Sequence, residues 1–248
     1  MHELKISVIT VCYNAESTIG RCIRSVIDQD HDNVEYIIID GHSQDGTLSI
    51  INNYNSQINI IVSEPDRGIY DAMNKGIALA TGNVVGILNA DDFFADNTIL
   101  SAVANAFVTS GADILYGDLD YVSPSGKIIR NWMSGDYKHG LFGKGWMPPH
   151  PTFYCKRELF KTFGNYSLEF GTAADYELMA RFIHLNRPQI FYLKQKMVKM
   201  ATGGASNKSY LTLIKVLYFD LKAMYKNNVD FPLIALVFKR LTKVKQFF

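Results

Sequence analysis

The sequence predicts an α/β fold: a single domain with a mostly parallel sheet flanked by helices, followed by an amphipathic helical tail. Short runs rich in Val and Ile, typical of strands buried on both faces, alternate with segments whose apolar residues recur at helical spacing. This alternation favours a parallel sheet with helices on both faces. The chain has 248 residues, of which 48% are hydrophobic and 20% charged, so it can bury a substantial core.

The first half contains four predicted strands, and each is an apolar run that ends in a polar residue. These strands cover residues 6–14, 34–40, 58–63 and 84–92. Apolar residues at helical spacing from Ile19 to Ile27 predict a helix after the first strand. A second helix is predicted around residues 48–51, and a third spans about 70–80 and ends at Thr81 and Gly82.

The pattern changes after Asp92. Asp96 or Asn97 can cap a helix that extends to about Val108. The turn residues 123–126, between apolar segments at 114–118 and 127–130, predict a hairpin. Residues 140–149 are rich in Gly and Pro and predict a mobile loop. The remaining predicted elements are a strand at 152–155, a helix at 173–185, a strand at 189–200, and tail helices at 211–225 and 232–248.

Polar residues follow the predicted strands at their carboxyl ends, where open α/β sheets bind ligands. They are Asn14, Asp40 with Ser43 and Asp45, Asp66 with Arg67, and Asp91 with Asp92. Two adjacent carboxylates at a sheet edge repel each other unless a cation compensates, and oxygen ligands of this kind suit Mg²⁺ or Mn²⁺ bridged to phosphates. The alternative is that Asp91 and Asp92 only begin a loop and cap the next turn.

Composition and motifs argue against several function classes. No Gly-x-Gly-x-x-Gly follows the first strand and no Gly-Lys-Ser/Thr loop occurs, which disfavours dinucleotide-binding and P-loop proteins. A net charge of +1 disfavours nucleic acid as the partner. There is no apolar span of about 20 residues, so no membrane-spanning helix is expected, and the N-terminus does not read as a signal peptide. Cys12, Cys22 and Cys155 form neither a disulfide framework nor a metal-ligand pattern, which favours the cytoplasm.

The tail differs from the rest of the chain in charge. From Asn207 onward it has eight basic and two acidic residues, a net charge of +6; because the whole chain carries +1, the part before it carries −5. Residues 232–248 combine apolar residues with four basic residues and no acidic one, which suits an interfacial helix on an anionic membrane leaflet. The alternative is an ordinary C-terminal helix packed on the domain.

Several motifs in order resemble the inverting nucleotide-sugar glycosyltransferases of family 2, which have the GT-A fold. They are Ser7 to Asn14, Ile39 to Thr47 and Leu88 to Asp92, and the resemblance covers about residues 5 to 205. The segment from Glu64 to Gly76 looks like the branch that builds bacterial surface polysaccharides such as O-antigen, capsule and colanic acid. The resemblance implies a domain at 1–205, with a nucleotide-binding half at 1–110 and an acceptor-binding half at 111–205, followed by the helical tail at 206–248.

The resemblance assigns the donor site to residues at the strand ends. Val11, Tyr13, Asn14 and Asp40 would hold uracil and ribose, since a carboxylate can accept hydrogen bonds from a base imide or ribose hydroxyls. Ser43 would support that loop, although Asx-turn and helix-cap chemistry explains it equally well.

Two further donor-site assignments concern the phosphates and the metal. Arg67 would lie near the nucleotide phosphates, or else form a surface salt bridge. Asn89, Ala90 and Asp91 match the family's Asp-x-Asp motif, so Asp91 would bind Mn²⁺ or Mg²⁺, and Asn89 departs from the pattern because an amide lacks the charge.

The resemblance places the catalytic base at Asp175, in a run where Ala174 replaces the family's Glu. One carboxylate must take the proton from the acceptor hydroxyl, and a helix N-terminus would keep it ionised. The alternative is an N-terminal helix charge, with Glu177 as reserve base. The residues assigned to the acceptor or pocket are Asp92, His150, Glu177 and Gly204, where His150 can instead be structural and Gly204 part of a linker before the tail.

These features predict an inverting hexosyl- or N-acetylhexosaminyltransferase that uses a UDP-sugar and a divalent cation. The expected acceptor is a saccharide or a polyprenyl-diphosphate-linked oligosaccharide, reached from the cytoplasmic face of the membrane with contact through residues 232–248. Two alternatives stay open: a sugar nucleotidyltransferase, which needs a glycine-rich basic loop that Asn14 to Ser17 does not provide, and a non-catalytic nucleotide-sugar-binding protein, suggested by Asn89 and Ala174.

Overall fold

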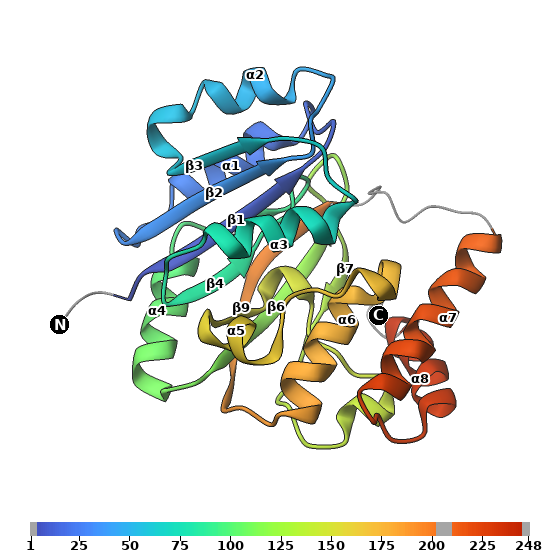
Figure 1. The fold of residues 1–248 in the computed structure, drawn as a ribbon. Coiled ribbons are helices and arrows are strands. Elements are labelled where there is room, and N and C mark those ends of the chain that lie inside the picture. The colour runs from blue at the N-terminus through green and yellow to red at the C-terminus, as the bar shows by residue number, and fades with distance from the viewer. Residues whose placement is uncertain (1–3, 202–209, 245–248) are drawn as a thin grey trace.

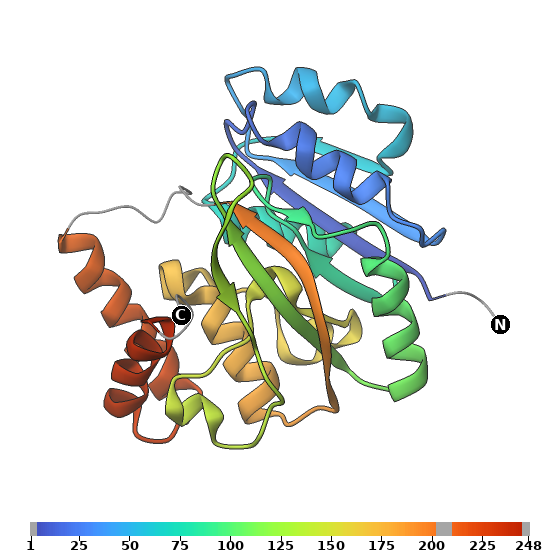
Figure 2. The same cartoon turned by 180° about the vertical axis from the view of Figure 1, so that it is seen from behind.

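The computed structural model describes residues 4–201 and 210–244, and its architecture is a mixed sheet between two layers of helices (Figures 1 and 2). The sheet order is β3-β2-β1-β4-β8-β6-β9-β5, with β7 paired to β6. The strands are β1 (Ile6–Cys12), β2 (Val34–Asp40), β3 (Ile60–Ser63), β4 (Val84–Ile87), β5 (Phe93–Phe94), β6 (Ile114–Val122), β7 (Ile128–Trp132), β8 (Tyr154–Lys156) and β9 (Ile190–Ala201).

The four strands of the first half are parallel, as predicted. β1 pairs with β2 and with β4, and β2 pairs with β3, all in parallel register. Beyond β4 the sheet becomes mixed, because β8 runs antiparallel to both β4 and β6. The hairpin prediction is confirmed by the antiparallel pairing of β6 with β7.

Helices cover both faces of the sheet. They are α1 (Ile19–Ile27), α2 (Thr47–Asn52), α3 (Ile69–Leu79), α4 (Ile99–Ser110), α5 (Glu158–Phe163), α6 (Ala174–Met179), α7 (Tyr210–Lys226) and α8 (Pro232–Val244), with single-turn helices η1 (Asn55–Gln57), η2 (Leu141–Lys144) and η3 (His150–Thr152), a 3₁₀ segment η4 (Leu168–Ala173) and a π-helical segment η5 (Ala180–Leu185). Among the described residues, no helix combines the length and apolar character needed to cross a bilayer.

Alternate side chains of the central strands point to opposite faces of the sheet, and each face has its own hydrophobic core. On β1, Ile6 and Val8 belong to a core that also holds residues of α1, α2 and α4, whereas Ile9 and Val11 belong to a core with residues of α3, α5 and α6. Figure 1 looks onto α3, α5 and α6, and Figure 2 looks onto α1 and α4 from behind. The period of two in a strand produces this division.

The structure corrects four local predictions. β4 ends at Ile87, so Asn89 to Asp92 lie in a turn and not at the end of a long strand. The helix predicted over 173–185 changes from α to π geometry at Ala180. Residues 158–163 form α5, which was not predicted.

The fourth correction concerns residues 140–149, predicted as a mobile loop. They are packed, because Phe142 is fully buried and the Trp146 Nε1–H donates to the Ser134 carbonyl at 2.8 Å. The burial of apolar side chains in this segment holds it in place, even though its Gly and Pro content is typical of a mobile loop.

Candidate functional site

The carboxyl ends of β1, β2 and β4 meet at one edge of the sheet. The Gly41 N–H donates to the Cys12 carbonyl at 2.8 Å, and the Ala90 N–H donates to the Val11 carbonyl at 3.3 Å. The Glu64 N–H donates to the Asp40 carbonyl at 3.0 Å. These bonds extend the parallel register past the strands, so the polar loops predicted at separate strand ends lie side by side.

Tyr13, Gly41 and Asp66 form one wall of this edge. Tyr13 is 63% exposed, which leaves its ring available to a ligand. A Cβ on Gly41 would stand 2.5 Å from Asp66 Oδ2 and 3.4 Å from Tyr13 Cδ2, so any larger residue there would displace the Asp66 carboxylate. Asp66 was recognised as a strand-end residue but not assigned to the site; its approach to Gly41 depends on tertiary contact that no local pattern carries.

Asp40 is fully buried and organises the loop that follows β2. Its carboxylate accepts hydrogen bonds from the Ser43 N–H at 3.1 Å, the Ser63 hydroxyl at 2.6 Å and the Ser43 hydroxyl. Ser43 Oγ in turn accepts from the Asn14 N–H at 2.8 Å. Asp40 and Ser43 therefore fix the backbone around Asn14 through side-chain hydrogen bonds, of which the one from Asn14 joins residues 29 positions apart in the sequence.

Arg67 directly follows Asp66 in the chain, but its side chain pairs with Asp71. Its side chain is 77% exposed and forms an i,i+4 ion pair with Asp71, with the nitrogen and oxygen 2.8 Å apart. The ion pair raises the pKa of Arg67 and lowers that of Asp71. In this structure Arg67 adopts the surface salt bridge that was the alternative to phosphate contact.

The turn after β4 carries Asn89, Asp91 and Asp92 in three different environments. Asn89 Nδ2 lies 3.0 Å from His150 Nε2, and Asn89 Oδ1 is buried without a partner among the described residues. The Asp91 carbonyl accepts from Arg21 at 3.3 Å. Asp92 was predicted to contact the acceptor or line the pocket, but its side chain is fully buried and does not reach the surface.

The burial of Asp92 changes its chemistry. Neither carboxylate oxygen of Asp92 has a hydrogen-bond partner with good distance and angle among the described residues. The Ala201 N–H and the Asn89 amide lie nearby. Burial and then the charge of Asp91 raise the pKa of Asp92 well above its usual range. Burial therefore favours the protonated form of Asp92 over the carboxylate.

His150 joins this turn to Asp175. His150 is the first residue of η3. Its ring Nδ1 lies 4.0 Å from Asp175 Oδ2, and its Nε2 faces Asn89. Burial lowers the pKa of His150 despite the opposing charges of Asp175 and Asp91, so the ring is neutral near pH 7. When Asn89 donates to Nε2, the neutral ring carries its proton on Nδ1, facing the carboxylate.

Asp175 sits at the start of α6 with its side chain 23% exposed. Its Oδ1 accepts from the Tyr176 N–H at 2.7 Å. Tyr70 stacks on Tyr166 close by, and burial and then the charge of Asp175 raise the pKa of the Tyr70 hydroxyl well above its usual range. Asp175 is thus a partly exposed side chain beside the Tyr70 ring, whose hydroxyl stays protonated.

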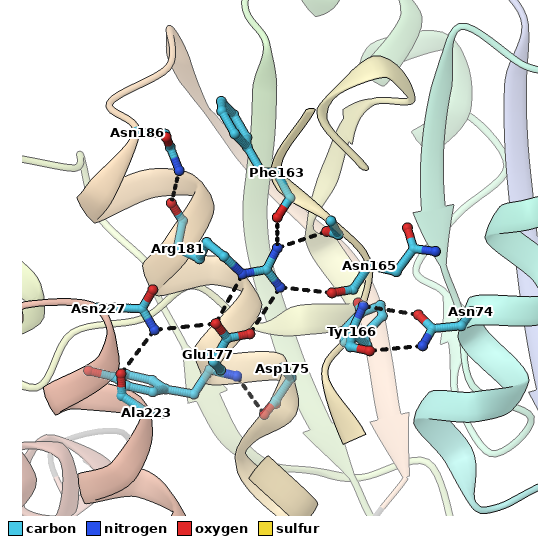
Figure 3. A network of polar contacts seen from close by, with 12 residues as sticks. Asn74, Phe163, Asn165, Tyr166, Asp175, Glu177, Arg181, Asn186, Ala223 and Asn227 are labelled. Atoms are coloured by element: carbon cyan, nitrogen blue, oxygen red, sulfur yellow. Dashed lines mark hydrogen bonds and ion pairs between the residues drawn. The ribbon is translucent and has the colours of Figure 1, made fainter. Parts of the chain in front are cut away.

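Glu177 points away from Asp175, into a structural network (Figure 3). Its oxygens accept from Arg181 Nε at 3.0 Å and Nη2 at 2.9 Å, and the side chain is 2% exposed. Arg181 also donates to the carbonyls of Phe163, Gly164 and Asn165. The structure therefore does not bring Glu177 to the site, and its oxygens are already occupied. Gly204 lies outside the described residues.

Metal binding by protein ligands alone is not supported in the described part of the chain, where no group of three or more His, Cys, Asp or Glu residues is arranged to hold an ion. The Asp91 carboxylate and the unpartnered Asn89 Oδ1 are oxygen donors of the type that Mg²⁺ and Mn²⁺ prefer. Such ions are commonly held by one or two carboxylates together with substrate phosphates. The residues present fit a cation that arrives with a diphosphate.

Comparisons with known sequences give one consistent result. The family described as Glycosyl transferase family 2 matches residues 7–172. A PGL/p-HBAD biosynthesis glycosyltransferase of Mycobacterium bovis is 32% identical over 180 residues, which cover 71% of this chain and 68% of the relative. An uncharacterized glycosyltransferase of Mycobacterium tuberculosis is 31% identical over 187 residues with the same coverage.

Solved structures share the fold. S. aureus TarS 1–349 in complex with UDP-GlcNAc matches with a TM-score of 0.73 and 19% identity, over 92% of this chain and 68% of that chain. In a longer TarS chain the match spans 40% of the length. The mannosyltransferase PcManGT from Pyrobaculum calidifontis, in complex with GDP-Man and Mn²⁺, matches with a TM-score of 0.65 and 18% identity, over 96% of this chain and 70% of that chain. These neighbours show the GT-A type of α/β fold.

Proposed function

Because the chain belongs to glycosyl transferase family 2, we propose that it is an inverting glycosyltransferase that moves a hexosyl or N-acetylhexosaminyl group from a UDP-sugar to a saccharide acceptor. One observation carries the proposal. Asn89, on the turn that would face the donor, is bridged by His150 to Asp175 through separations of 3.0 and 4.0 Å. Residues distant in sequence thus place a partly exposed carboxylate beside the donor turn.

Donor binding is proposed at the edge formed by β1, β2 and β4. Tyr13 offers a ring face to the base, and the backbone near Val11 and Asn14 is fixed by Asp40 and Ser43. Asp66 adds a carboxylate beside Gly41 that can accept from ribose hydroxyls. Asp91, with Ala90 and Asn89, faces the diphosphate end, where a bound Mn²⁺ or Mg²⁺ would neutralise the charge of the leaving group.

Asp175 is proposed as the general base. As the acceptor oxygen forms its bond to the anomeric carbon, Asp175 takes the hydroxyl proton and the bond from the anomeric carbon to the diphosphate oxygen breaks. Attack from the face opposite the leaving group inverts the anomeric centre. The Nδ1 of neutral His150 lies 4.0 Å from Asp175 Oδ2 and helps to position this carboxylate.

The proposed acceptor is lipid-linked, in the synthesis of a bacterial surface polysaccharide. The basic tail supports this part of the proposal, since a net charge of +6 from Asn207 onward suits an anionic leaflet. The enzyme would then act at the cytoplasmic face of the membrane, with contact through residues 232–248.

The test is calorimetric titration of UDP and GDP, each with and without Mn²⁺, on the wild type, Asp91→Ala and Asp175→Asn. We expect UDP to bind more tightly with Mn²⁺, Asp91→Ala to remove that gain, and Asp175→Asn to keep it. Asp175→Asn should lower turnover of the matching UDP-sugar by about 10²- to 10⁴-fold, the usual contribution of a general base. Absence of nucleotide binding under every condition would refute the donor site, and full activity of Asp175→Asn would refute the base.

A further inference from the structure

Helix α8 presents its apolar side to solvent. Leu233, Ile234, Val237, Phe238 and Leu241 are 62%, 53%, 57%, 45% and 55% exposed. Their spacing places them on one face of the helix. In a helix that only packs on its own domain, such a stripe would face the core, so α8 leaves an unusually large apolar stripe uncovered.

The inward side of α8 combines the buried Ala235 with a buried ion pair. Lys239 is 8% exposed, and its Nζ lies 2.7 Å from Asp220 Oδ1 and 3.8 Å from the centre of the Tyr176 ring. Arg240 Nη2 lies 3.7 Å from Asp220 Oδ2. A Cβ on Gly145, which directly follows η2, would stand 2.2 Å from the backbone nitrogen of Lys239. The end of η2 therefore lies very close to the backbone of α8. A buried ion pair, a cation–π contact and this close packing therefore fix which face of α8 points outward.

Helix α7 packs against α8 and adds to the same feature. Ile214, Tyr218 and Tyr225 share one face and are 53%, 61% and 61% exposed. Lys215 and Lys226 are exposed about a quarter turn further round the helix. Figure 1 shows the two helices together at one side of the molecule, away from α4.

We propose that this C-terminal apolar surface, formed by the outward faces of α7 and α8, docks on the anionic headgroup region of a lipid bilayer. An apolar surface with the exposed Lys215 and Lys226 beside it suits insertion at the headgroup and acyl-chain boundary. Charge favours lipid over a second copy of the chain, because a two-fold contact through this surface would bring together two tails of +6 each. The inference deepens the proposed function, on which it rests for its choice of a lipid-linked acceptor.

The docking surface is joined to the helix that carries Asp175. Tyr176, directly after Asp175, lies under Lys239 of α8. Asn227, just after α7, donates to the Glu177 carboxylate at 3.4 Å. Because both C-terminal helices contact α6 in this way, docking them on a membrane would fix the orientation of Asp175 relative to the bilayer.

The test is co-sedimentation of the full chain with vesicles of phosphatidylcholine alone and of phosphatidylcholine with phosphatidylglycerol. Val237→Glu is compared with Val108→Glu, because Val237 and Val108 are helical valines that are 57% and 65% exposed, and Val108 lies on α4. We expect binding to the anionic vesicles that weakens with salt, a loss of about tenfold or more for Val237→Glu, and wild-type binding for Val108→Glu.

Three outcomes would overturn the proposal: no binding to anionic vesicles, equal loss in both variants, or a wild-type dimer in solution that only Val237→Glu dissociates. UDP binding measured without vesicles separates this inference from the proposed function. Vesicle binding without UDP binding refutes the enzyme assignment alone, and UDP binding without vesicle binding refutes the docking surface alone.

Discussion

Glu35 is a carboxylate at the start of β2 whose side chain is only 6% exposed. Lys5 Nζ and the Ser7 hydroxyl donate to it at 2.9 and 2.6 Å, and the Thr81 N–H donates at 2.7 Å. Burial alone would raise the pKa of Glu35, but these hydrogen bonds outweigh burial and lower it to about 2. Glu35 thus ties the first strand to the turn before β4, two segments about 75 residues apart in the sequence.

We predict that Glu35→Gln destabilises the protein in a pH-dependent way. The pKa of Glu35 is lower in the folded chain than in the unfolded chain, so its contribution is complete above the unfolded value of 4.5 and is lost as pH falls toward 2. Its size at pH 7 is about 3 kcal/mol. Urea unfolding from pH 7 to pH 3 measures it, and the gap between variant and wild type should narrow as pH falls.

The matched control for this experiment is Glu169→Gln, at a carboxylate that is 76% exposed. It should change the free energy of unfolding by less than about 0.5 kcal/mol at any pH. A gap between Glu35→Gln and the wild type that stays constant across this pH range would contradict the linkage argument.

Single residues also mark the limit of the sequence prediction. The polar residues at the strand ends were predicted together because parallel strands align their carboxyl ends. The structure joins Asn14 to Asp40 through Ser43, but Arg67 forms a surface ion pair and Asp92 is buried. The bridge from Asn89 through His150 to Asp175 was not predicted as a contact, because it depends on how η3 and α6 pack against the β4 turn. The exposed ion pair of Arg67 and the buried one of Glu177 could not be told apart from sequence, since both are i,i+4 pairs.

At the scale of elements, long periodic segments were predicted well and junctions were not. The first four strands and the helices around α1, α3 and α4 follow from apolar spacing alone. The change to π geometry at Ala180 has no local signal, because it accompanies the packing of Arg181 across the turn after α5. Short α5 was missed although α2, which is also six residues long, was predicted; α2 follows a turn-rich loop, whereas α5 follows the end of β8 almost directly.

We predict that Arg181→Met strongly destabilises this junction. It removes the cation from buried Glu177 and three donors from the carbonyls of residues 163–165. An unpaired buried charge costs roughly 3–5 kcal/mol, which corresponds to a fall in Tm of about 10 °C for a chain of this size. Thermal unfolding measures the effect, while UDP binding should stay within about twofold of wild type because Glu177 lies away from the site.

The double variant Glu177→Leu/Arg181→Met gives the control for this prediction. Removing both charges avoids the unpaired carboxylate, so the double variant should be more stable than Arg181→Met alone. If the double variant were less stable than the single one, the cost would come from lost packing and lost carbonyl donors and not from the buried charge.

On the scale of the whole molecule, the C-terminal helices share the core of the sheet. Ala223, Met224, Val229 and Ala235 are buried in the same cluster as Ile9 and Val11 of β1. A Cβ on Gly171 would stand 2.7 Å from the Phe219 ring, which shows how tightly α7 lies on η4. The predicted boundary at residue 205 followed the extent of the family resemblance, whereas residues beyond it contribute to this same core.

We predict that a chain ending at residue 206 does not fold cooperatively. Removing α7 and α8 uncovers apolar surface on α6, η4 and η2, and each large side chain that loses its cover costs about 1.5–3 kcal/mol. Several such losses together are comparable to a total stability of roughly 5–15 kcal/mol. Near-ultraviolet circular dichroism and limited proteolysis should therefore show lost tertiary packing, whereas a chain ending at residue 244, which keeps every described residue, should match the full chain. If the chain ending at residue 206 unfolded cooperatively within about 5 °C of the full chain, a shift that corresponds to only one or two kcal/mol, the two helices would be an appendage and residue 205 a true domain boundary.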